Sequence, residues 1–557
     1  MHSLLSLLSL LTAVAAVPCP LPGQILPAPG NLLASPTFQS PFKNLTALLD
    51  SAVAGKIDAG IPGNETSFSI IVTDAQRELW SYHHTATETK NGTSKVGPDS
   101  QYRIASISKA ITDLLMIKVG ANLDDKITKY LPGLMSGNKL FAWDQVTLRD
   151  LGAQLSGIGL LYGFTDNFTA QGDFVKLGFP PAPKSDYPIC DAPGVGPSCT
   201  EALFVKGISN EVPLFPPHSR AAYSNVAFTL LAFAASNITG LSYEASVAKY
   251  ITEPLWMNNT SFLPQSESNM VIPPTVNEIW NADFGINNAG GGAFSTVSDL
   301  TKLAQTILKD GSSPFLSSTE IQTWLKPLSF NSDLYSAIGF PWEIVRSPNL
   351  STRGDIVDIY AKDGGVPGYS SRFALIPDYG IGFIVLVAGR QSSPAMGTIA
   401  EAVLAAAFPA VEAAGYEEII QYGYTGRFQA GNSSYVELTT DDGPGILVKS
   451  FHSNGVDTMT EVNKLSGGTI KSWRMYFTGV TRGEDEDWRV QFETSELSLP
   501  TSLGSKKVWD EICLGWAGVD RVWYAGKGVD RVIVRKRHGL VWAIESPAFR
   551  GVFTKVN

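Results

Sequence analysis

The sequence predicts an α+β protein in which helices flank an antiparallel sheet and an all-β domain follows at the C-terminus. The chain has 557 residues, more than one compact domain usually holds. Strand-like segments stand at both ends of a helix- and loop-rich stretch, and short β-like runs fill the chain after about residue 411. We therefore expect one domain over residues 19–410 and a second over residues 411–557.

The first half of the domain at residues 19–410 is predicted to contain a pair of strands followed by helices. A helical patch at 44–53 lies in Pro/Gly-rich sequence, and residues 67–83 read as two strands around a turn. Residues 106–119 carry apolar side chains at helical spacing. Segments 124–131 and 147–155 predict further short helices.

The second half returns from a long loop to helix and then to strands. Residues 156–220 are irregular and rich in Pro and Gly, as functional or mobile loops often are. An apolar helix is expected at 223–235, and a capping box at 296–299 starts another. Residues 356–387 alternate like strands and pair, we expect, with the first strands, before a small-residue helix at 395–408.

The C-terminal domain is a succession of strand-like runs, among them SYVELTT, GILVKSF, WRMYFTG, WRVQFET and RVIVRK. Turn residues separate these runs at fairly regular intervals. This pattern is typical of an all-β sandwich or barrel.

The N-terminus predicts a signal peptide over residues 1–18. Residues 4–17 are apolar, and Ala13, Ala15 and Ala16 resemble a cleavage site. A membrane anchor is the alternative, but the apolar stretch is short for a span and Pro18 ends it. We therefore expect a secreted protein, extracellular or in the secretory-pathway lumen, without a membrane partner after cleavage.

Glycosylation sequons and cysteines agree with an oxidising compartment. Cys190 and Cys199 flank a Pro/Gly-rich stretch that a disulfide would close into a loop. Cys19 and Cys513 are left either to pair or to stay free. The sequons begin at Asn44, Asn64, Asn91, Asn167, Asn237, Asn258, Asn259, Asn349 and Asn432.

Charge and histidine placement exclude two classes of function. The net charge of −10, with no Lys/Arg run, argues against a nucleic-acid partner. The six histidines are scattered, and no cysteine or histidine spacing matches a metal site. We expect no metal and no cofactor, and a small-molecule or peptide substrate.

Three short motifs occur in an order that suits serine acyl transfer. Ser106 and Lys109 form S-x-x-K at the start of an apolar helix, so the lysine can reach the serine hydroxyl as a base. S-x-x-K also occurs at 40–43, 136–139 and 246–249, but without those flanks.

The second motif is Y-x-N, formed by Tyr223 and Asn225 at the start of another apolar helix. A tyrosine near two lysines has its charged form favoured and can carry a proton between the serine and the leaving group. The asparagine amide is expected to hold either Lys109 or the substrate carbonyl.

The third motif, K-x-G, joins Lys362 to Gly364 at a strand edge. Glycine permits a close approach of substrate, and one N–H here could join that of Ser106 in an oxyanion hole. Asp363 lies between them and adds a negative charge. It either faces the pocket as a substrate-binding residue that repels carboxylates, or faces away by strand alternation.

The chain resembles the serine β-lactamase-like and penicillin-binding-protein superfamily, especially class C β-lactamases and their esterase and D-aminopeptidase relatives. The resemblance rests on YRIASISK, VTLRDLGAQLSGIG, PPHSRAAYSN, AGGGAFSTVSDL and KDGGVPGYSSRFALIP. It implies acylation of Ser106, Lys109 as the base, family roles for Tyr223, Asn225 and Lys362, and Gly365 as the second oxyanion donor. The tail resembles the C-terminal domain of some secreted fungal β-lactamase-like proteins.

The resemblance leaves several functions open. The leading hypothesis is a secreted serine hydrolase that cleaves a β-lactam-type amide, D-peptide or small ester. An acyltransferase, or an esterase or lactonase acting on a secondary metabolite, is the alternative, and a catalytically dead binding protein is a third. Asp363 and the run at 152–157, where many relatives have L-T-H-T-S-G, argue against true β-lactamase activity.

Overall fold

The computed structural model describes residues 20–89, 91–163, 170–191, 197–274, 279–465, 470–494, 513 and 515–556. The predicted signal peptide, Cys19 and Asn167 lie outside these residues. The chain forms two compact units, of which the larger contains Asn31–Ser347 and Val357–Ala410. The other contains Pro348–Ile356, Val411–Asn557 and the N-terminal segment that ends at Gly30.

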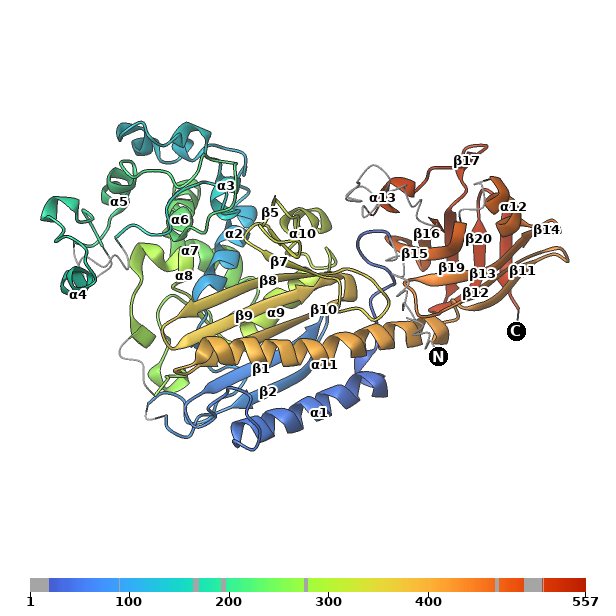
Figure 1. Ribbon diagram of the computed structural model, residues 1–557, viewed down its shortest axis with the longest axis horizontal. Coiled ribbons are helices and arrows are strands. Elements are labelled where there is room, and N and C mark those ends of the chain that lie inside the picture. Colours follow the sequence, from blue (N-terminus) through green and yellow to red (C-terminus); the bar gives the residue numbers. More distant parts are fainter. Residues whose placement is uncertain are drawn as a thin grey trace, which may run out of the picture. The chain divides into compact units, whose positions relative to one another are not determined.

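The larger unit is built on an eight-stranded antiparallel sheet (Figure 1). Two of its central strands are buried along their whole length. They come from the first and last predicted strand segments and pair directly, as the sequence led us to expect. The strand order is β2 (Glu78–His84), β1 (Ser67–Asp74), β10 (Ile381–Ala388), β9 (Tyr369–Ile376), β8 (Val357–Val366), β7 (Glu343–Ser347), β6 (Ser336–Ile338) and β5 (Ser329–Phe330).

Two long helices cross one face of this sheet, α1 (Pro36–Val53) and α11 (Ser392–Gln421) (Figure 1). By length and composition α11 could also cross a membrane. It instead buries a stripe at four-residue spacing, which is the pattern of a helix packed on a protein core. The stripe includes Ala395, Ile399, Val403 and Ala407.

The remaining helices and a short strand pair form the part of the unit that carries the first two motifs, whereas the third motif lies on β8 of the sheet. Helices α2 and α6 are buried on nearly all sides and therefore lie inside the core. The elements are β3 (Tyr102–Arg103), α2 (Ser108–Lys118), α3 (Leu148–Gly152), α4 (Gln171–Lys176), α5 (Glu201–Ile208), α6 (Asn225–Thr239), α7 (Tyr243–Val247), α8 (Asn288–Gly291), β4 (Phe294–Ser295), α9 (Val297–Leu308) and α10 (Ser318–Trp324).

Two local predictions differ from the structure. The expected helix at 124–131 is only a 3-10 turn, Ile127–Lys129. The irregular stretch 156–220 contains α4 and α5, and the Thr200 side chain caps α5 by accepting from Leu203 N–H. Both segments are short, and such elements depend more on tertiary contacts than on local propensity.

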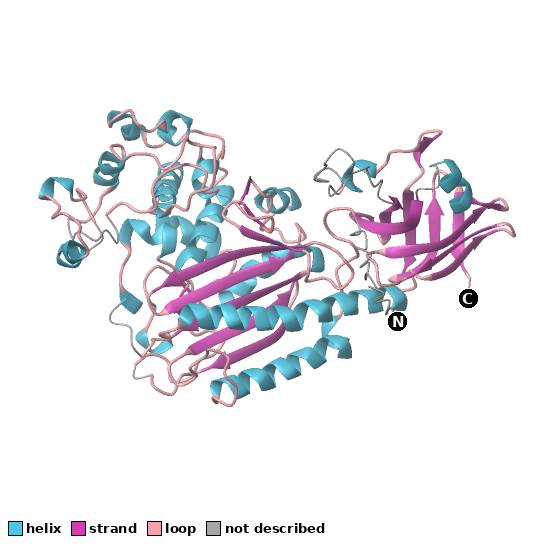
Figure 2. Ribbon diagram, in the orientation of Figure 1, coloured by secondary structure: helices cyan, strands magenta, loops and turns pink. Residues whose placement is uncertain are grey.

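The smaller unit is a barrel, which decides between the two all-β arrangements. Each strand pairs with the next, and the last pairs with the first, so the sheet closes on itself. Figure 2 shows that strands dominate this unit, whereas helices and strands mix in the larger one. The barrel strands are β11 (Gly426–Ala430), β12 (Ser434–Thr439), β13 (Ile446–Ser453), β15 (Ile470–Arg482), β16 (Asp485–Thr494), β19 (Arg531–Arg537), β20 (Leu540–Ser546) and β21 (Gly551–Lys555).

The barrel core is filled by large side chains. Strands such as β12 and β16 alternate buried and less buried residues, so one face of each strand packs inward. The unit also contains shorter elements, namely β14 (Val456–Asp457), α12 (Thr458–Leu465), α13 (Gly515–Gly518), β17 (Trp523–Tyr524) and β18 (Lys527–Gly528). The buried cluster includes Phe428, Met475, Trp488, Val534 and Phe553.

Candidate active site

Ser106 lies in a tight turn that leads directly into α2. The turn is a 3-10 helix, Ala105–Ile107, and the following helix begins at Ser108. Ala105 has a φ of 44°, a left-handed conformation that an alanine seldom adopts and that is often found at functional sites. Ser106 is partly exposed, whereas its neighbours on both sides are buried.

Lys109 is fully buried and is held by three oxygens. Its Nζ lies 3.0 Å from Ser106 Oγ and donates to Asn225 Oδ1 at 2.6 Å. It also donates to the carbonyl oxygen of Gly290. A neutral amine has two N–H groups, which these two fixed acceptors occupy, so its lone pair is left to face the Ser106 hydroxyl.

The environment of Lys109 favours this neutral form. Burial and then the neighbouring Lys362 hold the pKa of Lys109 well below its usual range, while Glu343 and Asp113 partly oppose the shift. Asp113 lies one turn further along α2 and is itself fully buried. Burial raises the pKa of Asp113 well above its usual range, so the carboxyl adds little negative charge beside the lysine.

Tyr223 lies between the two lysines of the motifs. Its ring centroid is 4.8 Å from Lys109 Nζ and 5.4 Å from Lys362 Nζ. The side chain is 40% exposed, so it lines the open side of the site. Both lysine side chains lie close to the ring, so Tyr223 belongs to the same cluster of side chains as Ser106.

Lys362 projects from β8 into the site and is ion-paired with Glu343 of the adjacent strand β7. Its Nζ also donates to the carbonyl oxygen of Asp363 at 2.9 Å. Burial alone would lower the pKa of Lys362, but Glu343 and Tyr223 outweigh it and raise the pKa above its usual value. Lys362 is therefore a cation in the neutral pH range.

Asp363 does not contribute its side chain to the site, contrary to its assignment as a substrate-binding residue. It forms a two-fold ion pair with Arg372, with N–O distances of 2.7 and 2.6 Å. Arg372 stands directly opposite Asp363 on β9. Successive side chains of a strand point to opposite faces, so Lys362 and Gly364 face Ser106 and Asp363 faces away.

Gly364 allows β8 to approach the serine turn. A Cβ atom at this position would lie 2.2 Å from the carbonyl oxygen of Ile104 and 3.0 Å from the backbone nitrogen of Ser106. Only glycine fits there. By contrast, a Cβ atom at Gly365 would meet no atom within 4 Å, so this residue borders open space next to the serine.

The predicted disulfide joins Cys190 to Cys199. It closes part of the irregular segment between the first two motifs. Cys513 is disulfide-bonded as well. Within the residues that the structure describes, no group of three His, Cys, Asp or Glu side chains could hold a metal ion.

Comparison with known proteins assigns both parts of the chain to known families. The sequence model of the family described as Beta-lactamase matches residues 52–408, and a second, described as Beta-lactamase-like-like, C-terminal domain, matches residues 418–557. The chain belongs to the beta-lactamase family. The resemblance noted in the sequence is thereby confirmed, as is the α+β fold of β-lactamases and transpeptidases followed by a domain of mostly strands.

Full-length relatives share both parts of the chain. A beta-lactamase-like protein of Arthroderma benhamiae is 34% identical, and the match covers 98% of each chain. A probable hydrolase, M10, of a Phoma species is 27% identical over 92% of this chain and 87% of its own. Among solved structures, a D-stereospecific amidohydrolase from Streptomyces aligns with a TM-score of 0.47 at 21% identity, over 65% of this chain and 98% of that chain.

The run at residues 152–157 holds the second motif in place. Gln154 Oε1 accepts from Ser224 N–H at 2.7 Å, and its carbonyl accepts from Ala222 N–H at 2.8 Å. Gln154 thus fixes the segment that carries Tyr223. A Cβ atom at Gly152 would lie 2.1 Å from the ring of Phe340, so a larger residue does not fit there.

Sequence reasoning missed three contributors to the site, namely Gly290, Glu343 and Gln154. Each acts across a large sequence separation, through a backbone carbonyl, an ion pair or hydrogen bonds to backbone amides. The segment AGGGAF had been noted only as part of the family resemblance. No local pattern could have shown that its Gly290 carbonyl reaches the buried lysine.

Proposed function

We propose that this protein is a secreted serine hydrolase that cleaves an amide or ester through an acyl-Ser106 intermediate. The observation that carries the proposal is the position of Lys109 Nζ, 3.0 Å from Ser106 Oγ, in surroundings that hold its pKa well below the usual range. A serine hydroxyl needs a base to become a nucleophile, and a lysine can be that base only while it is neutral.

In the first step, Lys109 takes the hydroxyl proton while Ser106 Oγ bonds to the substrate carbonyl carbon. The negative charge that develops on the carbonyl oxygen requires fixed N–H donors. The backbone N–H groups of Ser106 and Gly365 are the donors we propose. The nearness of β8 to the serine turn at Gly364 and the open space at Gly365 support this assignment.

The bond to the leaving group then breaks, and the leaving nitrogen or oxygen needs a proton. We assign that transfer to Tyr223, which lies between the two lysines and is partly exposed. The tyrosine gives its proton to the leaving group and regains one from Lys109. Water attacks the acyl-enzyme by the reverse sequence, releases the acid and restores Ser106.

The acceptor of the acyl group is proposed to be water. The full-length relative M10 is called a probable hydrolase, which favours hydrolysis over acyl transfer to another metabolite. Because Asp363 faces away, it does not repel substrates, and β-lactams, D-peptides and small esters all stay candidate substrates. A panel of these three classes with product mass spectrometry would identify the preferred bond.

Covalent labelling tests the mechanism directly. The wild-type protein should react with a fluorophosphonate probe, and Ser106→Ala should lose that reaction while its thermal unfolding midpoint stays unchanged. Ser136→Ala is the matched control, because Ser136 also begins an S-x-x-K sequence but is exposed. Equal labelling of Ser106→Ala and wild type would contradict the proposal.

Secretion is tested separately. Expression of the full chain in a eukaryotic host should deliver the protein to the medium with a new N-terminus near residue 19. N-terminal sequencing would locate the cleavage site, and a loss of mass on enzymatic deglycosylation would show that the sequons carry glycans. Retention of residues 1–18 on the secreted protein would contradict signal cleavage.

A further inference from the structure

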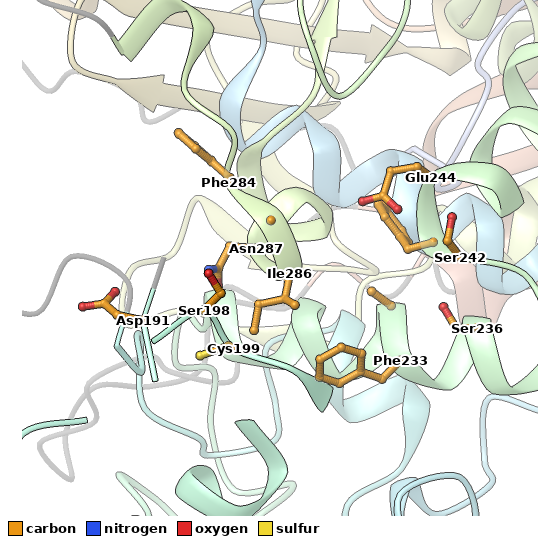
Figure 3. A pocket seen from close by; sticks show the side chains of 13 residues that line it. Asp191, Ser198, Cys199, Phe233, Ser236, Ser242, Glu244, Phe284, Ile286 and Asn287 are labelled. Carbon is orange, nitrogen blue, oxygen red and sulfur yellow. The ribbon is translucent and has the colours of Figure 1, made fainter. Parts of the chain in front are cut away.

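A surface cleft away from the catalytic residues has the size of a small-molecule site. Its volume is about 340 Å³, within the range of about 300–1,000 Å³ typical of such sites. Phe233 comes from α6, Glu244 from α7, Phe284 and Ile286 from the segment before α8, and Cys199 from the disulfide loop (Figure 3). The disulfide therefore shapes one wall of the cleft.

The cleft is separate from the acylation site. Asn225, which bonds Lys109, begins α6, and Phe233 lies eight residues further along the same helix. At 1.5 Å per residue this is about 12 Å along the helix axis. None of Ser106, Lys109 and Lys362 lines the cleft.

The charges at the cleft are all negative. Asp191 and Glu244 are the only charged residues of its lining, and in the view of Figure 3 they lie on opposite sides of Ile286. Glu244 Oε1 accepts from Asn288 Nδ2 at 3.0 Å, and Glu244 has no ion-pair partner among the residues that the structure describes. The carboxylate is exposed, so it is available to a ligand.

Besides these charges, the cleft offers apolar surface and hydroxyl groups to a ligand. Phe233 and Ile286 offer an apolar surface, and an aromatic face also attracts a cation. The hydroxyls of Ser236 and Ser242 can accept hydrogen bonds from N–H groups. We propose that this cleft binds a small organic cation, an ammonium group carried on an aromatic or branched apolar body.

The test uses 2-phenylethylammonium as the probe and 2-phenylethanol as its uncharged counterpart. Binding is measured by titration calorimetry on the full-length Ser106→Ala protein, so that turnover does not interfere. The ammonium should bind at least about fivefold more tightly than the alcohol. Equal affinities, or no detectable binding of the ammonium at about 10 mM, would overturn the proposal.

Single substitutions test whether the ammonium probe binds in the cleft. Glu244→Gln should weaken ammonium binding about fivefold, and its amide oxygen can still accept the hydrogen bond from Asn288. Glu253→Gln removes the same charge from an exposed residue outside the cleft and should leave binding unchanged. Ser236→Phe should block the cleft and abolish binding of both compounds.

A last measurement separates the cleft from the catalytic site. Wild-type protein whose Ser106 has been phosphonylated by a fluorophosphonate should bind the ammonium as tightly as the Ser106→Ala protein. Loss of binding on phosphonylation, or unchanged binding in both Glu244→Gln and Ser236→Phe, would place the probe elsewhere and overturn the proposal.

Discussion

Asn225 Oδ1 accepts a hydrogen bond from Lys109 Nζ at 2.6 Å, which joins the second catalytic motif to the first. The sequence left open whether this amide holds the lysine or the substrate, and the geometry places it on the lysine. An amide oxygen fixes the amine without adding charge. A neutral partner is what a buried lysine needs if it is to stay a base.

Replacing this amide by a carboxylate should therefore suppress acylation. Asn225→Asp places a negative charge against Lys109 and should raise its pKa, so kcat/KM at pH 7 should fall tenfold or more. Asp is well tolerated in the first turn of a helix, so α6 should still form. The check is a pH profile of ester hydrolysis whose rising limb moves to higher pH, with Asn225→Ala as the uncharged control.

Two charges beside Lys109 should move its titration in opposite directions. Lys362 lowers the pKa of Lys109 and Glu343 raises it. Because the neutral base acts above its pKa, Glu343→Gln should shift the rising limb of kcat/KM to lower pH, and Lys362→Met should shift it to higher pH. Shifts of the same sign would contradict the assignment of Lys109 as the base.

The two glycines of the third motif should respond differently to alanine. Gly364→Ala forces a Cβ atom against the Ile104 carbonyl and the serine turn, so acylation by a small ester should fall at least tenfold. Gly365→Ala meets open space and should keep the thermal unfolding midpoint of the wild type and the labelling of Ser106 by a small probe. Equal losses in the two variants would show that the contact at Gly364 does not matter.

Asp363 should not select substrates. Asp363→Thr breaks the ion pair with Arg372 on the far face of β8, and each side chain of the pair is about a third exposed. The loss of stability should be within about 1 kcal/mol. The change in kcat/KM should be the same, within about twofold, for a carboxylate-bearing β-lactam and a neutral ester. A selective gain for the β-lactam would restore a direct role for Asp363.

A partly buried carboxyl, Asp378, offers a test of the fold rather than of the site. Burial, and then the neighbouring Asp358, raise the pKa of Asp378 to about 6. The folded state therefore holds a proton that the unfolded state has lost, and stability falls as pH rises from about 4 to 6. Asp378→Asn should raise the unfolding midpoint at pH 7 and have little effect at pH 4, as read by calorimetry.

The sequence by itself determined the features that neighbouring residues encode. The i, i+3 spacing of Ser106 and Lys109, the strands β1 and β10 and the N-cap of α9 at Thr296 all follow from local sequence patterns, and the structure has them. The predicted capping box is only half formed, because the Asp299 side chain accepts from Asn259 N–H instead. The short loop between Cys190 and Cys199 likewise favoured their pairing. Local steric and hydrogen-bonding rules act over a few residues, which is the range that a sequence pattern reports.

The tertiary structure alone decided how distant parts of the chain converge. The sequence could not show on which face of β8 the Asp363 side chain lies, because that depends on the register between β8 and β9 and on Arg372 opposite it. It could not reveal the Gly290 carbonyl on Lys109, the Glu343 ion pair with Lys362, or the closure of the barrel. These contacts join residues far apart in sequence, and only the packing of the core brings them within hydrogen-bond distance.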